Sequence, residues 1–276
     1  MTASYLHGSP MTPRAALAGS PHTYLVEVVS ANAAAVLASS TEQLAFAANL
    51  EAVRACFSAR IFSFALHADR IQLVLRHQAE RRDGDEALRA RWQALYPGRR
   101  GPATGWSDRF TTLAGFMQVL LQRYGRERHE RTGGSGRQWA HRYRAVLLSD
   151  DRALLAISGA VVGQATALWT SLMPGPVNLA SLPLRGEGAL TMPADEAPPG
   201  MPPASLDPLG AAAARVTGPP AELARTYAQA MRQAWAIGQP ESLHEVLARL
   251  GRATGKGRHR RLHELDDALG LCAVWG

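Results

Sequence analysis

The sequence has a single lysine, Lys256, among thirty basic residues, and only two cysteines, Cys56 and Cys272. The cysteines lie far apart and neither has the spacing of a metal ligand. The sequence therefore predicts a reduced, cytoplasmic setting without a disulfide framework. Arginine binds phosphate bidentately and stacks on bases, whereas an arginine-only bias also arises from GC-rich coding. Both explanations stay open at this point.

The first 22 residues lack a continuous apolar run, so we expect no secretory signal peptide. The sequence also lacks an internal repeat. The stretch Ala153–Met173 is uncharged and long enough to span a membrane, but serine, threonine, glycine and glutamine dilute it. We expect a buried helix there and no membrane partner, with a membrane-spanning helix as the alternative.

Acidic residues are outnumbered, 23 against 30 basic ones, which gives a formal net charge of +7. A positive balance of this size favours an anionic partner such as nucleic acid. Hydrophobic residues make up 46% of the chain, enough for a sizeable core and too many for wholesale disorder.

The charge is concentrated in Gln122–Leu148, which carries seven arginines against two glutamates. Aromatic residues interleave with the arginines, and this mixture suits single-stranded or structured nucleic acid. The alternative is a solvated basic helix end followed by an ordinary strand, with Tyr124 and Trp139 as core residues. The candidate nucleic-acid contacts in this stretch are Arg123, Arg126, Arg128, Arg137, Trp139, Arg142 and Tyr143.

Patterning predicts strands and helices in a definite order. The expected elements are a strand over 22–29, a helix opened by the capping box Ser40–Gln43, a hairpin of 60–66 and 70–76, a helix from Thr112, a strand over 142–148, and a helix from Ala153 capped by Asp150 or Asp151. This order indicates an α+β fold, an antiparallel sheet backed by helices, with a C-terminal helical extension.

The composition also predicts how the chain divides into segments. They are a disordered leader (1–21), the main domain (22–172) with a polar excursion (78–108) that holds a short helix near Ala87–Leu95, a proline-rich linker (173–218), and a C-terminal helical segment with a basic tail (219–276). In the last segment one helix is expected from Pro219 to Gly238, carrying Trp235, and a second from Ser242 to Gly251.

Several motifs, in collinear order, resemble the REP-associated tyrosine transposase lineage of the single-tyrosine HUH transposases. The likeness covers about residues 20–170 and 222–262. The matching stretches are Phe64–Leu75 (FALHADRIQLVL), Arg123-Tyr124 fifteen residues ahead of Trp139, Arg142-Tyr143-Arg144-Ala145, Asp150–Ser158 (DDRALLAIS) and Ala234–Leu243 (AWAIGQPESL).

The resemblance implies a ferredoxin-like HUH domain in which two strand histidines hold a divalent metal and a tyrosine attacks the scissile phosphate. Tyr124 matches the nucleophile. The two metal-ligand histidines, however, fall on Arg70 and Gln72. Arginine stays protonated and cannot ligate a metal, and one amide oxygen is a poor ligand.

We therefore expect a transposase-like protein that binds single-stranded or hairpin DNA and is impaired in metal-dependent cleavage. No cofactor is expected, and a homodimer is possible. Arg70 and Gln72 are candidates for binding the phosphate that the metal would polarise, with a solvent-facing strand-end arginine as the favoured alternative for Arg70. An alternative is an active transposase or nickase that uses Mg²⁺ or Mn²⁺ and draws ligands from His67, Asp69 or His129. A third reading is a decayed reading frame without function.

Overall fold

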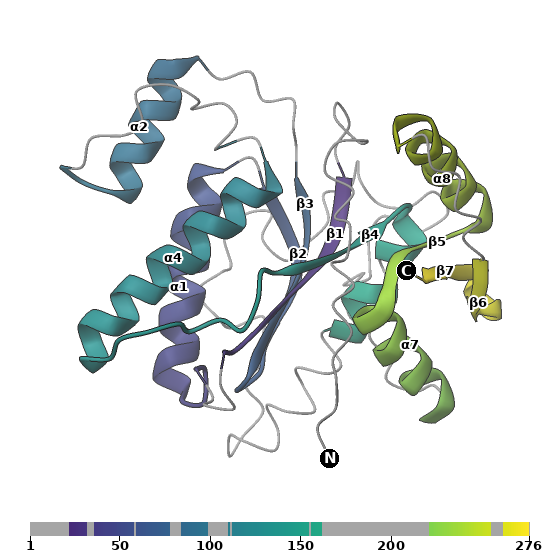
Figure 1. Ribbon diagram of the computed structural model, residues 1–276, viewed down its shortest axis with the longest axis horizontal. Helices are drawn as coiled ribbons and strands as arrows, with labels where there is room; N and C mark the ends of the chain where they lie inside the picture. Colours follow the sequence, from purple (N-terminus) through teal and green to yellow (C-terminus); the bar gives the residue numbers. More distant parts are fainter. Residues whose placement is uncertain are drawn as a thin grey trace, which may run out of the picture.

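The computed structural model of the chain describes residues 22–31, 36–57, 59–77, 84–98, 110, 112–154, 156–161, 221–254 and 262–275. Within these residues seven strands form one sheet in the order β2-β3-β1-β4-β5-β7-β6 (Figure 1). The strands are β1 (His22–Val29), β2 (Ala59–Leu66), β3 (Arg70–His77), β4 (Arg144–Leu148), β5 (Ala234–Gly238), β6 (Leu262–Asp266) and β7 (Leu271–Trp275). All paired neighbours are antiparallel except β4 and β5, which are parallel. The predicted α+β class with a mostly antiparallel sheet is confirmed.

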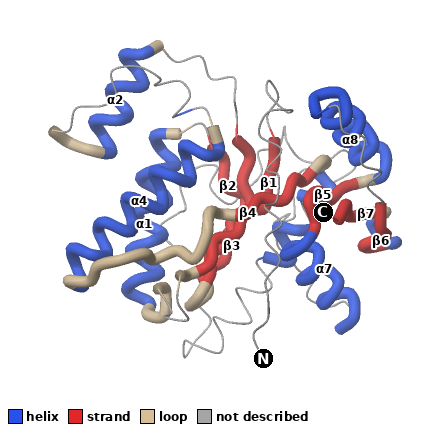
Figure 2. The backbone as a smooth tube through the Cα atoms, in the orientation of Figure 1, coloured by secondary structure: helices blue, strands red, loops and turns tan. Residues whose placement is uncertain are grey.

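Helices α1 (Ser40–Cys56) and α4 (Leu113–Thr132) cover the half of the sheet built from β1 to β4 (Figure 2). Their apolar stripes meet alternate residues of the strands, such as Ile71, Leu73 and Leu75 of β3, because successive strand residues point to opposite faces. We call the side of the sheet under α1 and α4 the first face.

The predicted boundaries of these elements are close to the observed ones. Helix α4 begins next to Thr112, as predicted, and Thr112 caps it by accepting a 3.0 Å hydrogen bond from the Gly115 N–H. Helix α1 is capped one residue earlier than predicted, by Ser39, which accepts from the Glu42 N–H at 3.2 Å. Helix α2 (Asp85–Leu95) confirms the short helix expected in the excursion. Its buried Leu88 and Leu95 join the same core.

The second face carries helical residues 151–154 and 156–161 together with α7 (Ala221–Gln233). The predicted cap is confirmed, because Asp150 Oδ1 accepts from the Ala153 N–H at 2.9 Å. Helix α8 (Pro240–Thr254) packs against β5 and β7, where its Leu243 joins a small core with Leu147. Leu147 lies beside Tyr24 on the first-face side of its strand, so α8 covers the first face of this half.

The C-terminal segment is not the helical extension expected. Three of its elements are strands, β5, β6 and β7, and they continue the main sheet. The helix expected to reach Gly238 ends at Gln233, and Trp235 lies in β5. A five-residue apolar run such as Ala234–Gly238 has no periodicity of its own, so its sequence alone does not separate a buried strand from a helix end.

The leader (1–21) and the linker (173–218) lie outside the described residues, as does most of the basic tail. Part of the excursion (78–108) and the later part of Ala153–Met173 are outside them too. Among the helices that are described, none is long and apolar enough to cross a bilayer.

Candidate functional site

A row of polar side chains crosses the second face of the sheet. Gln72 of β3 pairs in register with Glu27 of β1, which in turn pairs with Arg144 of β4. The Gln72 amide donates to Glu27 Oε2 at 3.1 Å, and its Oε1 lies 3.3 Å from His67 Nε2. Only 2% of Gln72 is exposed. Its donor and its acceptor are therefore both engaged within the protein.

His67 ends this row in the turn between β2 and β3, and it is as buried as Gln72. Burial lowers the pKa of His67, and the nearby charge of Arg70 lowers it further. A neutral imidazole that donates from Nε2 to Gln72 leaves Nδ1 as an acceptor, and Nδ1 has no protein partner. His67 is thus a neutral, buried histidine at neutral pH.

The donor set does not fit the divalent metal that the resemblance implies. Arg70 forms a 3.5 Å ion pair with Asp69 and remains a cation, while the Gln72 oxygen already faces His67. Of the three alternative ligands, His67 and Asp69 sit at the hairpin, but His129 lies on α4 over the opposite face. Within the described residues no group of three or more His, Cys, Asp or Glu side chains is placed to hold a metal.

Tyr124, the matched nucleophile, is a core residue under the first face. None of it is exposed, and its ring meets Phe46 edge-on at 5.1 Å between ring centroids. Its hydroxyl donates a 2.5 Å hydrogen bond to Glu42 of α1, and burial together with this bond raises the pKa of Tyr124. Gln72 faces the other side of the sheet. Tyr124 and the two matched metal positions are therefore not brought together in one chain.

Glu42 links α1 to the basic C-terminal part of α4 by ion pairs with two arginines. Its Oε2 accepts from Arg131 at 2.7 Å and lies 3.7 Å from Arg128 Nε. The Glu42 side chain is only 15% exposed, so its charge acts on both guanidinium groups with limited solvent screening. Two of the arginines that give this region its positive character are held by an internal carboxylate.

The remaining candidates divide by exposure. Arg126, Arg137 and Arg142 are exposed, and Arg126 also lies over the Tyr96 ring, 6.0 Å from its centroid. Arg123 is half-buried, where it donates to Asn49 and pairs with Glu127. Arg126 lies on α4, whereas Arg137 and Arg142 belong to the segment between α4 and β4, whose path back to the sheet is seen in Figure 2.

The aromatic candidates are mainly packing residues. Trp139 forms an isolated antiparallel β-bridge with Ser30 and packs on the first-face core. The centroid of its ring lies 6.1 Å from that of the Tyr124 ring. Tyr143 packs on the same core beside Tyr24, whose pKa is raised to about 12 by burial and by Tyr143. Trp139 and Tyr124 therefore lie among core residues, which agrees with the alternative interpretation of this stretch.

A separate cavity lies at the end of β4. Strands β4 and β5 are parallel, and the helix that follows β4 goes to the second face while α8, after β5, goes to the first. Divergence of this kind is a topological switch point, where α/β sheets commonly bind ligands. The close approach of the two strand ends requires Gly238, because a Cβ there would lie 1.7 Å from Ser149 Oγ.

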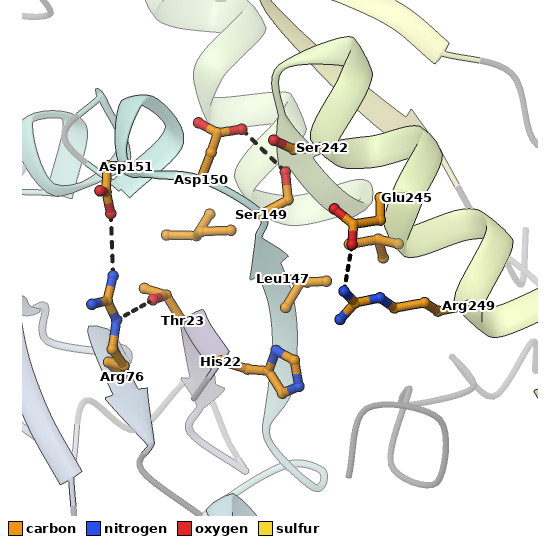
Figure 3. A pocket seen from close by; sticks show the side chains of 12 residues that line it. His22, Thr23, Arg76, Leu147, Ser149, Asp150, Asp151, Ser242, Glu245 and Arg249 are labelled. Carbon is orange, nitrogen blue, oxygen red and sulfur yellow. Dashed lines mark hydrogen bonds and ion pairs between the residues drawn. The ribbon is translucent and has the colours of Figure 1, made fainter. Parts of the chain in front are cut away.

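The cavity has a volume of about 240 Å³. Figure 3 shows Arg76 and Asp151 on one side of β4, with Glu245 and Arg249 of α8 on the other. Arg76 donates to Asp151 at 3.2 Å and to Thr23 at 3.0 Å, and Glu245 pairs with Arg249. Nothing in the sequence pointed to this cavity, because its lining comes from four separate stretches of the chain.

Models of known protein families, curated proteins and solved structures contain no match to this chain.

Proposed function

We propose that this chain is a transposase-like protein of the cytoplasm that binds single-stranded or hairpin DNA and does not cleave it by the metal-dependent tyrosine route. The observation that carries the proposal is the separation of Tyr124 from Gln72. Tyr124 is bonded to Glu42 under the first face, whereas Gln72 is bonded to Glu27 and His67 on the second.

Binding is supported by charge. The formal net charge is +7, and exposed Arg126, Arg137 and Arg142 lie on or beside the loop between α4 and β4. Guanidinium groups on an exposed segment neutralise phosphates without requiring a base sequence. Half-buried Arg123 and Arg128 lie on the same helix and add positive charge there, although each is paired with a glutamate, Glu127 and Glu42 respectively.

Loss of cleavage is supported by chemistry. The Arg70 guanidinium occupies the position of a metal-ligand histidine of the family. Because it is a cation without an acceptor atom, these residues do not support a metal-dependent cleavage step. Arg70 is still accessible to a phosphate, because its side chain is 35% exposed. A buried tyrosine with a raised pKa is also a poor nucleophile, because the phenolate is the attacking form.

The ancestry is supported by topology. The first half runs β-α-β-β-α-β if α2 is set aside, and its strands lie in the order β2-β3-β1-β4. Ferredoxin-like domains have the same order of elements and strands, and this similarity supports the proposed HUH lineage. Fold alone does not assign an activity, so the proposal depends on the residues above.

The test is a two-arm assay on one labelled DNA hairpin with a single-stranded tail. Native electrophoresis measures binding, and denaturing electrophoresis with Mg²⁺ or Mn²⁺ detects a covalent protein–DNA adduct. We expect a shifted complex and no adduct. An adduct that disappears in Tyr124→Phe establishes the active alternative, and absence of any complex refutes the binding function. Gel filtration with light scattering decides between a monomer and the homodimer that the resemblance allows.

A further inference from the structure

The cavity at the switch point between β4 and β5 is distinct from the surfaces used above. It lies at the start of β1 and the end of β4, whereas the loop between α4 and β4 reaches the sheet at the start of β4. Its volume of about 240 Å³ is below the roughly 300–1,000 Å³ of pockets for drug-sized molecules. A ligand for this cavity is therefore small.

An anion is a poor fit, although two helices begin here. Asp150 already supplies the negative charge that helix N-termini favour. Its Oδ1 accepts from the Ala153 N–H at 2.9 Å, and its Oδ2 accepts from the Gln239 N–H, just before α8, at 2.6 Å. A second negative charge beside this carboxylate would be repelled.

The rest of the lining is balanced in charge. Arg76 is paired with Asp151, and Arg249 is paired with Glu245 (Figure 3). The lining is otherwise mostly polar, because His22, Thr23, Ser149 and Ser242 contribute to it, whereas Leu147 and Leu148 are almost fully buried and Val246 is a partly exposed aliphatic group. A lining of charge-paired side chains and hydroxyls, with carboxylate oxygens that can accept, suits a small neutral molecule that carries hydrogen-bond donors.

We propose that this cavity binds a single unpaired nucleobase that carries an exocyclic amino group. The ring lies against the partly exposed Val246, and the amino group donates to the Glu245 carboxylate. Glu245 can exchange its present partner, Arg249, for the amino group, because the side chains of Glu245 and Arg249 are 64% and 46% exposed and an exposed ion pair is weak. In the cell the base would come from the bound DNA, and in that respect the inference rests on the proposed function.

The chemistry selects among bases. Cytosine, adenine and guanine each carry an exocyclic amino group that a carboxylate accepts, whereas thymine has none and presents a carbonyl where cytosine and adenine present the amino group. A carbonyl facing Glu245 leaves two acceptors opposed. Charged hydrogen bonds of this kind correspond to about a tenfold difference in affinity between the two kinds of base.

Titration of the full-length protein with free deoxycytidine, deoxyadenosine and thymidine tests the cavity without DNA. Two-dimensional NMR of backbone amides reports where each nucleoside binds. We expect saturable shifts at Ser149 and along 241–249, with deoxycytidine and deoxyadenosine about tenfold tighter than thymidine. Glu245→Gln should remove this preference. Glu241→Gln, an exposed neighbour on α8 outside the cavity, should retain it.

Equal binding of thymidine, shifts elsewhere in the protein, or no saturable shift up to about 20 mM nucleoside would overturn the inference. The result is independent of the DNA assay. Nucleoside binding without DNA binding would support the base-binding cavity and refute the proposed function. DNA binding without nucleoside binding would support the proposed function and refute the base-binding cavity.

Discussion

The hydroxyl of Tyr124 donates a 2.5 Å hydrogen bond to Glu42, although the two residues are 82 positions apart. This bond joins α1 to α4 inside the first-face core. Tyr124→Phe removes it and keeps the ring. A hydrogen bond to a charged group contributes about 1.5–3 kcal/mol, so the free energy of unfolding should fall by about that amount. Urea denaturation measures the change, and affinity for single-stranded DNA should stay within about twofold. Unchanged stability with lost DNA processing would instead favour a catalytic role for Tyr124.

Glu42 restrains two of the basic residues on α4. Glu42→Gln weakens the hold on Arg131 and Arg128, so the affinity for single-stranded DNA should rise about three- to tenfold at low salt. Fluorescence anisotropy with a labelled oligonucleotide measures it. Glu51→Gln is the matched control, because it removes the same charge from α1 but frees only Arg54 of the same helix. An equal gain in both variants would mean that net charge alone is responsible.

Two glycines give opposite predictions. Gly238→Ala places a Cβ against Ser149 Oγ and 2.5 Å from Asp150 Oδ2, so strand β5 must move away from β4. Overpacking of this kind costs about 1–3 kcal/mol or more. Gly125→Ala adds a methyl group in α4 at an ordinary 3.5 Å from Gln138 Oε1 and should stabilise by about 0.5–1 kcal/mol. Thermal denaturation compares the two. Similar melting temperatures for them would contradict the close approach of β4 and β5.

His67 predicts how stability depends on pH. Burial lowers its pKa in the folded state below the ordinary value of 6.5, so the unfolded state binds more protons as the pH falls below 6.5. Stability is then lost from pH 6.5 down to the lowered folded pKa, by at most about 1.4 kcal/mol per pH unit. Above about pH 7.5 both states are neutral and His67 contributes no slope. His67→Asn should flatten urea midpoints measured between about pH 7.5 and 5.5. An unaltered slope would show that other groups cause it.

The sequence predicted the first half of the fold well because its signals are local. The β2–β3 hairpin alternates apolar and polar residues around a short turn, and Thr112 precedes a regular stripe. Strand β5 was missed because its partners, β4 and β7, are distant in sequence and its apolar run has no period.

The candidate site was predictable only in part. Arg126, Arg137 and Arg142 are exposed, as a basic stretch implies. The ion pair of Arg131 with Glu42 was not predictable, because the two residues are 89 positions apart. Gln72 was expected to face a phosphate. Its contacts with Glu27 and His67 depend on strand register and on the hairpin turn, neither of which composition specifies.

The proposed function requires sequence-tolerant binding of single-stranded DNA by the basic surface of α4 and the loop after it. The direct measurement is the dissociation constant of a labelled hairpin with a single-stranded tail, taken at several salt concentrations from about 50 to 200 mM. We predict binding at about micromolar concentration or below, weakened about tenfold or more across this range, with a smaller salt slope when Arg126, Arg137 and Arg142 are replaced by Gln. No binding at the lowest salt, or a salt slope that the triple replacement leaves unchanged, would contradict it.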